Sequence, residues 1–182
     1  SDNGVGMNER ELESNLGVIA ASGTEEFKKA QGKVDDNDLI GQFGVGFYSS
    51  FMVAESVTVV SKKVGESAAY KWVSNGVDGF DILPAERNGY GTDVIITLKE
   101  DGEESYSEFV EEYRLSALVK KYSDYIRYPI RMLTQKISDG DGATAEELKT
   151  LNSMTPVWKK RKSELGESEL DEFYKHTYRD YR

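Results

Sequence analysis

The residues best suited to chemistry form a glycine-rich loop, Gly41-Gln42-Phe43-Gly44-Val45-Gly46-Phe47, that runs directly into an apolar stretch. Glycine adopts backbone angles closed to other residues and lets a ligand approach the main chain, so this loop can direct several N–H donors at one anion. Its spacing, G-x-x-G-x-G, differs from the dinucleotide-binding pattern and from the Walker loop. On spacing alone, a phosphate cradle and an ordinary glycine-rich turn remain equal alternatives.

Two other segments carry groups that suit a flat ring with an exocyclic amine, such as adenine. One is Asp2-Asn3-Gly4-Val5-Gly6-Met7, and the other is Gly91-Thr92 at the start of a β-branched run. A carboxylate accepts a hydrogen bond from the amine, glycines let the ring lie against the backbone, and a threonine hydroxyl reaches the ring directly or through water. Taken singly, Asp2 is better explained as a solvated turn and Thr92 as a strand cap.

Composition restricts the function without choosing it. The 182 residues suffice for one domain, or for one domain plus a fragment of another. A net charge of -10 repels a phosphate backbone and disfavours nucleic acid as the partner. With no apolar run able to cross a bilayer and no signal peptide, we expect no membrane partner and a cytoplasmic location. The absence of cysteine and the single histidine exclude disulfides, thiolate metal sites and two-histidine metal sites.

A helix is predicted directly after the first glycine pair. Asn8 can cap it with Glu11 at the third position, and its inner side carries Leu12, Leu16 and Ile19. Ligand approach at Gly4 and Gly6 is therefore expected at a helix N-terminus.

A polar stretch separates this helix from the glycine loop. Thr24 is predicted to cap a short helix through Phe27 and Ala30. The segment between Gly23 and Gly41 is a candidate lid over the site, and the alternative is an ordinary surface loop.

Strand patterns dominate the middle of the sequence. Four short runs separated by glycines predict an antiparallel meander with one apolar face, at residues 57–59, 70–72, 80–82 and 94–98. A helix over 115–126, with Tyr122 on its apolar side, is predicted to cover that face, and Pro129 separates it from a last strand at 130–135. Asp139-Gly140-Asp141-Gly142 predicts a linker.

The segments DNGVGM, SNLGVIAASGT, IGQFGVGFYSSF and GTDVIITL occur in this order. They resemble the ATP-binding domain of the ninety-kilodalton heat-shock chaperones, in particular the bacterial HtpG type. Gyrase-type topoisomerases, mismatch-repair ATPases and sensor histidine kinases share the D-x-G-x-G motif, whereas GQFGVGFYS is specific to the chaperones. The resemblance implies a GHKL-type α/β fold, a two-layer sandwich of a mostly antiparallel sheet covered by helices, here N-terminally incomplete.

The tail also resembles this family. The segments Thr155-Pro156-Val157-Trp158 and Glu172-Phe173-Tyr174-Lys175-His176 are similar to the beginning of its middle domain. We therefore expect a partial ATP-binding domain at 1–137, a linker at 138–150 and the start of the middle domain at 151–182.

The resemblance implies that ATP or ADP is bound at positions matching the family's motifs. Asp2 accepts a hydrogen bond from the adenine amino group, and Thr92 completes the base site. Gly6 and Met7 line the base pocket, and Asn15 lies near the sugar and phosphates.

The phosphates are expected at the glycine loop, where the matching residues are Gly44, Val45, Gly46 and Phe47. Ala21 stands where relatives usually carry a lysine that reaches the phosphates, so reduced phosphate affinity is expected.

No catalytic or metal-binding residue can be assigned in this sequence. In the family, the catalytic glutamate and the asparagine that binds Mg²⁺ lie on a helix before the D-x-G-x-G motif, at which this chain begins. The resemblance implies a stress-response ATPase that couples its nucleotide state to the folding of client proteins and dimerises through a C-terminal domain. For this chain alone, a nucleotide-binding or interaction module without hydrolysis is the alternative, and a DNA-repair or topoisomerase subunit is a weaker third.

Overall fold

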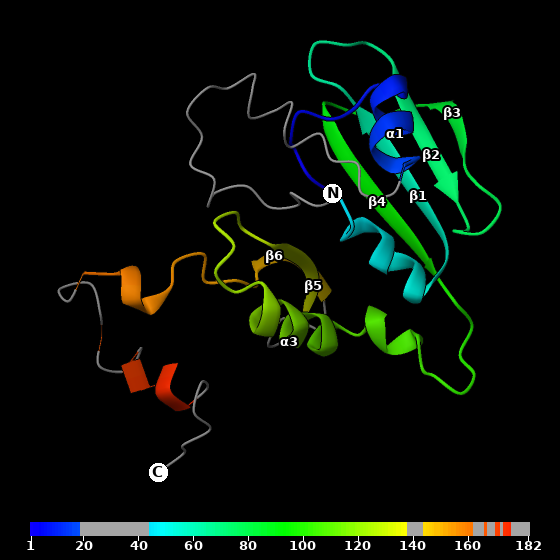
Figure 1. The fold of residues 1–182 in the computed structure, drawn as a ribbon. Coiled ribbons are helices and arrows are strands. Elements are labelled where there is room, and N and C mark those ends of the chain that lie inside the picture. Colours follow the sequence, from blue (N-terminus) through cyan, green and yellow to red (C-terminus); the bar gives the residue numbers. More distant parts are fainter. Residues whose placement is uncertain (19–43, 138–143, 162–165, 167–169, 172, 176–182) are drawn as a thin grey trace. The chain divides into compact units, whose positions relative to one another are not determined.

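The computed structural model describes residues 1–18, 44–137, 144–161, 166, 170–171 and 173–175 (Figure 1). These residues belong to two compact units, Ser1–Ser107 and Glu108–Arg182, which we describe separately. The division by compactness falls after Ser107, and the domain limits expected at 137 and 150 stay predictions. The short helix predicted after Thr24 and the candidate lid between Gly23 and Gly41 lie outside the described residues.

The first unit is built on a four-stranded antiparallel sheet. Its strands are β1 Ala54–Lys62, β2 Ala69–Ser74, β3 Asp81–Ala85 and β4 Gly91–Leu98, in the order β3-β2-β1-β4. The predicted strands are present, but the predicted meander is wrong for β4, which pairs with β1 instead of β3. β3 is an edge strand that carries Pro84, and proline removes a backbone donor that a further neighbour would need.

One face of this sheet carries the core. Alternating residues of β1 and β2 lie on that face, where Val59 is paired with Trp72. Their buried cluster consists of Leu12, Ala54, Val57, Val59 and Trp72. Two helices contact this face, α1 Glu9–Leu16 and the 3-10 helix η2 Phe47–Met52 (Figure 1). An antiparallel sheet with helices on one face confirms the predicted α/β fold class.

Helix α1 begins where the sequence predicts. The Asn8 side chain accepts a hydrogen bond from the Glu11 N–H, and the Glu11 side chain accepts one from the Asn8 N–H, which forms a capping box. Leu12 is fully buried and Leu16 packs against the core, as predicted for the inner side. Ile19, assigned to the same side, lies outside the described residues.

The second unit combines a helix with a two-stranded sheet. Its elements are α3 Glu112–Tyr122, strands β5 Arg131–Ile137 and β6 Thr144–Thr150, and the 3-10 helix η4 Val157–Lys159; a further 3-10 helix, η3 Ser107–Val110, spans the boundary between the units. The structure places β6, antiparallel to β5, in a segment where the sequence predicts only a linker. The predicted helix ends at Tyr122 instead of 126, and Tyr122 is exposed rather than part of a core.

Asn152 fastens the loops of the second unit. Its side chain is buried, accepts a hydrogen bond from Ile130 N at 2.8 Å, and donates to the carbonyls of Ile126 and Tyr128 at 2.8 and 3.0 Å. One amide therefore satisfies three backbone groups between α3 and β5. Among the described residues, no helix has the length and apolar character needed to cross a membrane.

Candidate functional site

Asp2 lies against the first residues of β4. Its N–H donates to Thr92 O at 2.8 Å, and its Oδ1 accepts from Gly4 N at 2.8 Å and from Thr92 N at 3.3 Å. The predicted base-site residues Asp2 and Thr92, which are 90 positions apart, are thus held together by backbone and side-chain contacts. The carboxylate remains exposed, and its Oδ2 has no hydrogen-bond partner among the described residues.

A buried hydroxyl pair joins Met7 to the same point. Ser61 on β1 is 0% exposed, and its Oγ accepts from Met7 N at 2.8 Å. The Ser61 and Thr92 hydroxyls lie 2.9 Å apart, and Ser61 Oγ is 3.2 Å from Gly91 O. Ser61 was missed by the sequence analysis, although it continues the inward alternation of Val57 and Val59 with a polar residue.

Arg87 fixes the position of Asp2 from the loop between β3 and β4. Its guanidinium donates to both carboxylate oxygens of Asp93 at 2.9 and 3.1 Å, and to the carbonyls of Gly89 and Tyr90 at 3.1 and 2.6 Å. A further N–H donates to Asp2 O at 2.9 Å. The hydrogen bond from Arg87 is the main cause that lowers the pKa of Asp93. Arg87 therefore positions Asp2. It was not predicted as a site residue, because it belongs to no recognised motif.

Two glycines of this site are required by the packing of the chain itself. Gly6 has φ +66°, and a Cβ there would lie 1.9 Å from the Lys62 carbonyl oxygen. Gly91 has φ +117°, and its Cβ would lie 2.2 Å from the Asp2 carbonyl oxygen. From the sequence, we expected glycine at position 6 because a ring could lie against its backbone, whereas close packing on β1 is by itself a sufficient reason.

Asn15 lies on α1, near Met7. Its Nδ2 is 3.9 Å from Met7 Sδ, and both side chains are partly buried. Glu11 pairs with Lys63 and anchors the start of α1 to the turn after β1. Burial raises the pKa of the Glu11 carboxyl, but the hydrogen bonds from Lys63 and the Asn8 backbone outweigh this effect and lower the pKa overall.

The described part of the glycine loop leads into η2. Gly44 has φ +61°, while Gly46 has the ordinary helical φ of -60°. Among the described residues, nothing lies within 4 Å of a Cβ built at Gly46. Val45 is about half exposed. No described residue therefore obstructs the backbone at Gly46.

The side chain of Phe47 is partly buried and packs against the core, where its ring meets Trp72 edge to face at 5.5 Å. A contact of Phe47 with an anion would therefore run through its backbone. The next residue, Tyr48, donates its hydroxyl to Leu16 O at 2.9 Å, and burial raises the pKa of this phenol. Tyr48 thus ties the loop to the end of α1.

Helix α1 connects the two groups of site residues. The contacts of Met7 and Asn8 hold its start, and the Tyr48 contact holds its end. Eight residues at 1.5 Å per residue give a separation of about 12 Å between these ends. The two groups of contacts therefore lie at opposite ends of α1.

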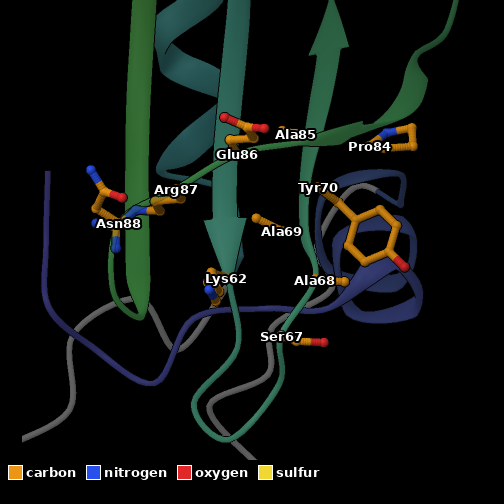
Figure 2. Close-up of a pocket in the computed structure, with 10 residues that line it drawn as sticks. All are labelled: Lys62, Ser67, Ala68, Ala69, Tyr70, Pro84, Ala85, Glu86, Arg87 and Asn88. Atoms are coloured by element: carbon orange, nitrogen blue, oxygen red, sulfur yellow. The ribbon is translucent and has the colours of Figure 1, made fainter.

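The surface pocket of 370 Å³ shown in Figure 2 is a different feature. It lies where the β1–β2 turn meets the end of β3, and its lining includes Lys62, Tyr70, Arg87 and Asn88. None of the predicted site residues lines it. Because it shares no residue with the predicted site, we do not identify the two.

The described residues contain no group of three or more His, Cys, Asp or Glu side chains that could hold a metal ion. The expectation that Mg²⁺ is bound through a residue upstream of position 1 stays a prediction.

Comparison with known proteins shows what the chain is similar to. Residues 1–85 match the family described as histidine kinase-, DNA gyrase B-, and HSP90-like ATPase. The chain is 52% identical over 180 residues to the chaperone protein HtpG of Bacillus subtilis (strain 168), covering 96% of this chain. The chain resembles the HtpG chaperones over nearly its whole length. HtpG of Alkaliphilus oremlandii is 52% identical over 179 residues, and HtpG of Clostridium perfringens is 51% identical over 180 residues. The chain spans about 29% of the length of each of these relatives.

Proposed function

We propose that the first unit binds ATP or ADP, with the base beside Asp2 and the phosphates beside the glycine loop. The observation that carries this proposal is the network that joins Asp2, Met7, Ser61 and Thr92. It holds a carboxylate oxygen that has no partner in the described part of the chain next to a buried hydroxyl pair, which suits a ligand that offers an amine donor. The match of residues 1–85 to an ATPase family supports the choice of a nucleotide.

Each predicted residue has a defined task in this proposal. Asp2 Oδ2 accepts from the base, and Gly6 and Met7 form one wall of its site. Asn15 is placed to contact the sugar and phosphates from α1. The residues that hold the phosphates through their backbone are Gly44, Val45, Gly46 and Phe47. Thr92 completes the base site through its hydroxyl, which Ser61 orients at 2.9 Å.

Bound ATP would supply a phosphoanhydride bond for hydrolysis. The described residues of this chain position the nucleotide at its base and along its phosphates. We assign none of them to the activation of water or to Mg²⁺, because no carboxylate group with a metal-binding arrangement occurs among them.

For the whole protein, we propose an ATP-dependent chaperone that couples its nucleotide state to the folding of client proteins. The similarity to HtpG chaperones along 96% of the chain supports this. A homodimer, a cytoplasmic location, a role in the stress response and the use of Mg²⁺ belong to the same proposal. A net charge of -10 argues against nucleic acid as a partner.

A second candidate is a nucleotide-binding module without hydrolysis. It applies to this chain because no residue of the sequence could be assigned to the activation of water or to Mg²⁺. Phosphate release from ATP, measured for this chain with and without a chelator of magnesium, separates the two candidates. Metal-dependent release would support the ATPase, whereas tight ADP binding without release would support the module.

Substitution of Asp2 tests the base site. Asp2→Asn keeps Oδ1, which accepts from Gly4 and Thr92, and replaces the free Oδ2 with an amide donor. The affinity for ADP in calorimetry should fall roughly ten- to hundredfold, the equivalent of about 1–3 kcal/mol for a lost and mismatched hydrogen bond. Asp81→Asn is the matched control, because Asp81 is an exposed carboxylate on β3 of the same unit. Equal affinities of the two variants would remove Asp2 from the site.

A further inference from the structure

Asn-Gly pairs occur three times in this chain, at Asn3-Gly4, Asn75-Gly76 and Asn88-Gly89. Glycine has no Cβ, so its backbone nitrogen can approach the amide carbon of a preceding asparagine. Attack of that nitrogen on Cγ forms an N–Cγ bond, breaks the Cγ–Nδ2 bond and releases ammonia, leaving a five-membered succinimide. Water then opens the ring to aspartate or isoaspartate. No oxidant, reductant or cofactor is needed.

Hydrogen bonds restrain this reaction at Asn75. Its Oδ1 accepts from Val77 N at 3.0 Å and Asp78 N at 3.1 Å, and its Nδ2 donates to Asp78 Oδ2 at 2.9 Å. The attacking nitrogen, Gly76 N, donates to Ser74 Oγ at 3.0 Å. The side chain must leave this turn before the two atoms can react.

At the first pair, Asn3-Gly4, the attacking nitrogen also donates a hydrogen bond. Gly4 N donates to Asp2 Oδ1 at 2.8 Å. The reaction requires loss of the proton from this nitrogen, and a hydrogen bond to a carboxylate opposes that loss because the negative charge favours the protonated amide.

Asn88 has neither restraint. Its side chain is exposed, and among the described residues neither this side chain nor Gly89 N has a hydrogen-bond partner. Gly89 has φ +77° and open space around its Cα, where an added Cβ would meet nothing within 4 Å of the described chain. Figure 2 shows Asn88 on the loop between β3 and β4.

We propose that Asn88 is a site of spontaneous deamidation, at which the folded chain forms aspartate and isoaspartate with water as the only co-reactant. The product acts directly on Arg87, whose guanidinium holds Gly89 O and Tyr90 O on one side and Asp2 O on the other. Isoaspartate inserts one methylene group into the main chain and displaces Gly89 O. The modification therefore loosens the contact that positions Asp2.

Peptide mapping by mass spectrometry tests the site. The 182-residue chain is incubated in mildly alkaline buffer below its unfolding temperature, and isoaspartate is quantified with an isoaspartyl methyltransferase. Product at Asn88 should form roughly tenfold faster than at Asn75, because the hydrogen bonds of Asn75 must be broken first. In concentrated denaturant, the three pairs should react at similar rates. Equal rates at the three pairs in the folded chain, or faster reaction at Asn3 or Asn75, would overturn the proposal.

Amide exchange tests the consequence. The Asp2 N–H, which donates to Thr92 O, should exchange faster in the aged chain than in fresh chain. Asn88→Ser, which cannot form the succinimide, should keep its original exchange rate over the same incubation. Unchanged exchange at Asp2 in a chain shown to carry isoaspartate at 88 would overturn the link to Arg87.

Discussion

Ser61 provides a sharp test of how the candidate site is held together. Ser61→Ala removes a fully buried hydroxyl that accepts from Met7 N and contacts the Thr92 hydroxyl. The Thr92 hydroxyl loses its contact at 2.9 Å, and the Met7 N–H, which is fixed by the backbone, loses its partner. An unsatisfied buried donor costs about 1–3 kcal/mol, so the free energy of unfolding should fall by about that amount.

Urea unfolding followed by circular dichroism measures this change. The matched control is Thr58→Ala, which removes a hydroxyl from the same strand on the opposite face, where Thr58 makes no hydrogen bond through its side chain among the described residues. Ser61→Ala should be the less stable variant, and the Met7 N–H should exchange with solvent faster. If both variants had the same midpoint and the Met7 N–H kept its protection, the reasoning on the buried network would be refuted.

Three further outcomes are expected. Gly46→Val should weaken ATP and ADP binding in calorimetry with little loss of stability, because no described residue lies within 4 Å of a Cβ at Gly46 and its φ is ordinary; parallel losses of binding and stability would contradict this. Gly6→Ala should instead destabilise the fold in urea, because the added Cβ would meet Lys62 O, and wild-type stability would show that the segment can move. Asp93→Asn should reduce stability at neutral pH and flatten its acid dependence. Because the pKa of Asp93 is lowered in the folded chain, its ion pair adds stability that is fully present above the unfolded pKa of about 3.9 and is lost as the pH falls through the folded pKa. An unchanged dependence of stability on acid pH would argue against the pairing with Arg87.

The start of α1 and the positions of the strands could be predicted because their signals are local. Asn8 and Glu11 lie three residues apart and form the cap by themselves. Alternating apolar residues, such as Val57 and Val59, mark a strand with one buried face regardless of its neighbours.

The order of the strands and the support of Asp2 depend on pairs that are distant in sequence. β4 joins β1 through partners such as Ser61 and Thr92, and nothing in either strand alone specifies this choice. Arg87 contacts Asp2 across 85 positions, so its role emerges only when the fold brings the two together. The strand β6 was missed because its polar residues lack the alternation of a half-buried strand.

The two tryptophans of the chain lie in different units and in opposite environments. Trp72 is 2% exposed, and its Nε1 has no hydrogen-bond partner among the residues that the structure describes, while Trp158 is 65% exposed. An indole in a dry, apolar setting emits at shorter wavelength than one in water, and an aqueous quencher reaches only the exposed ring. A single emission spectrum therefore contains two separable components, and their separate loss during a titration reports whether the two units unfold together or one after the other.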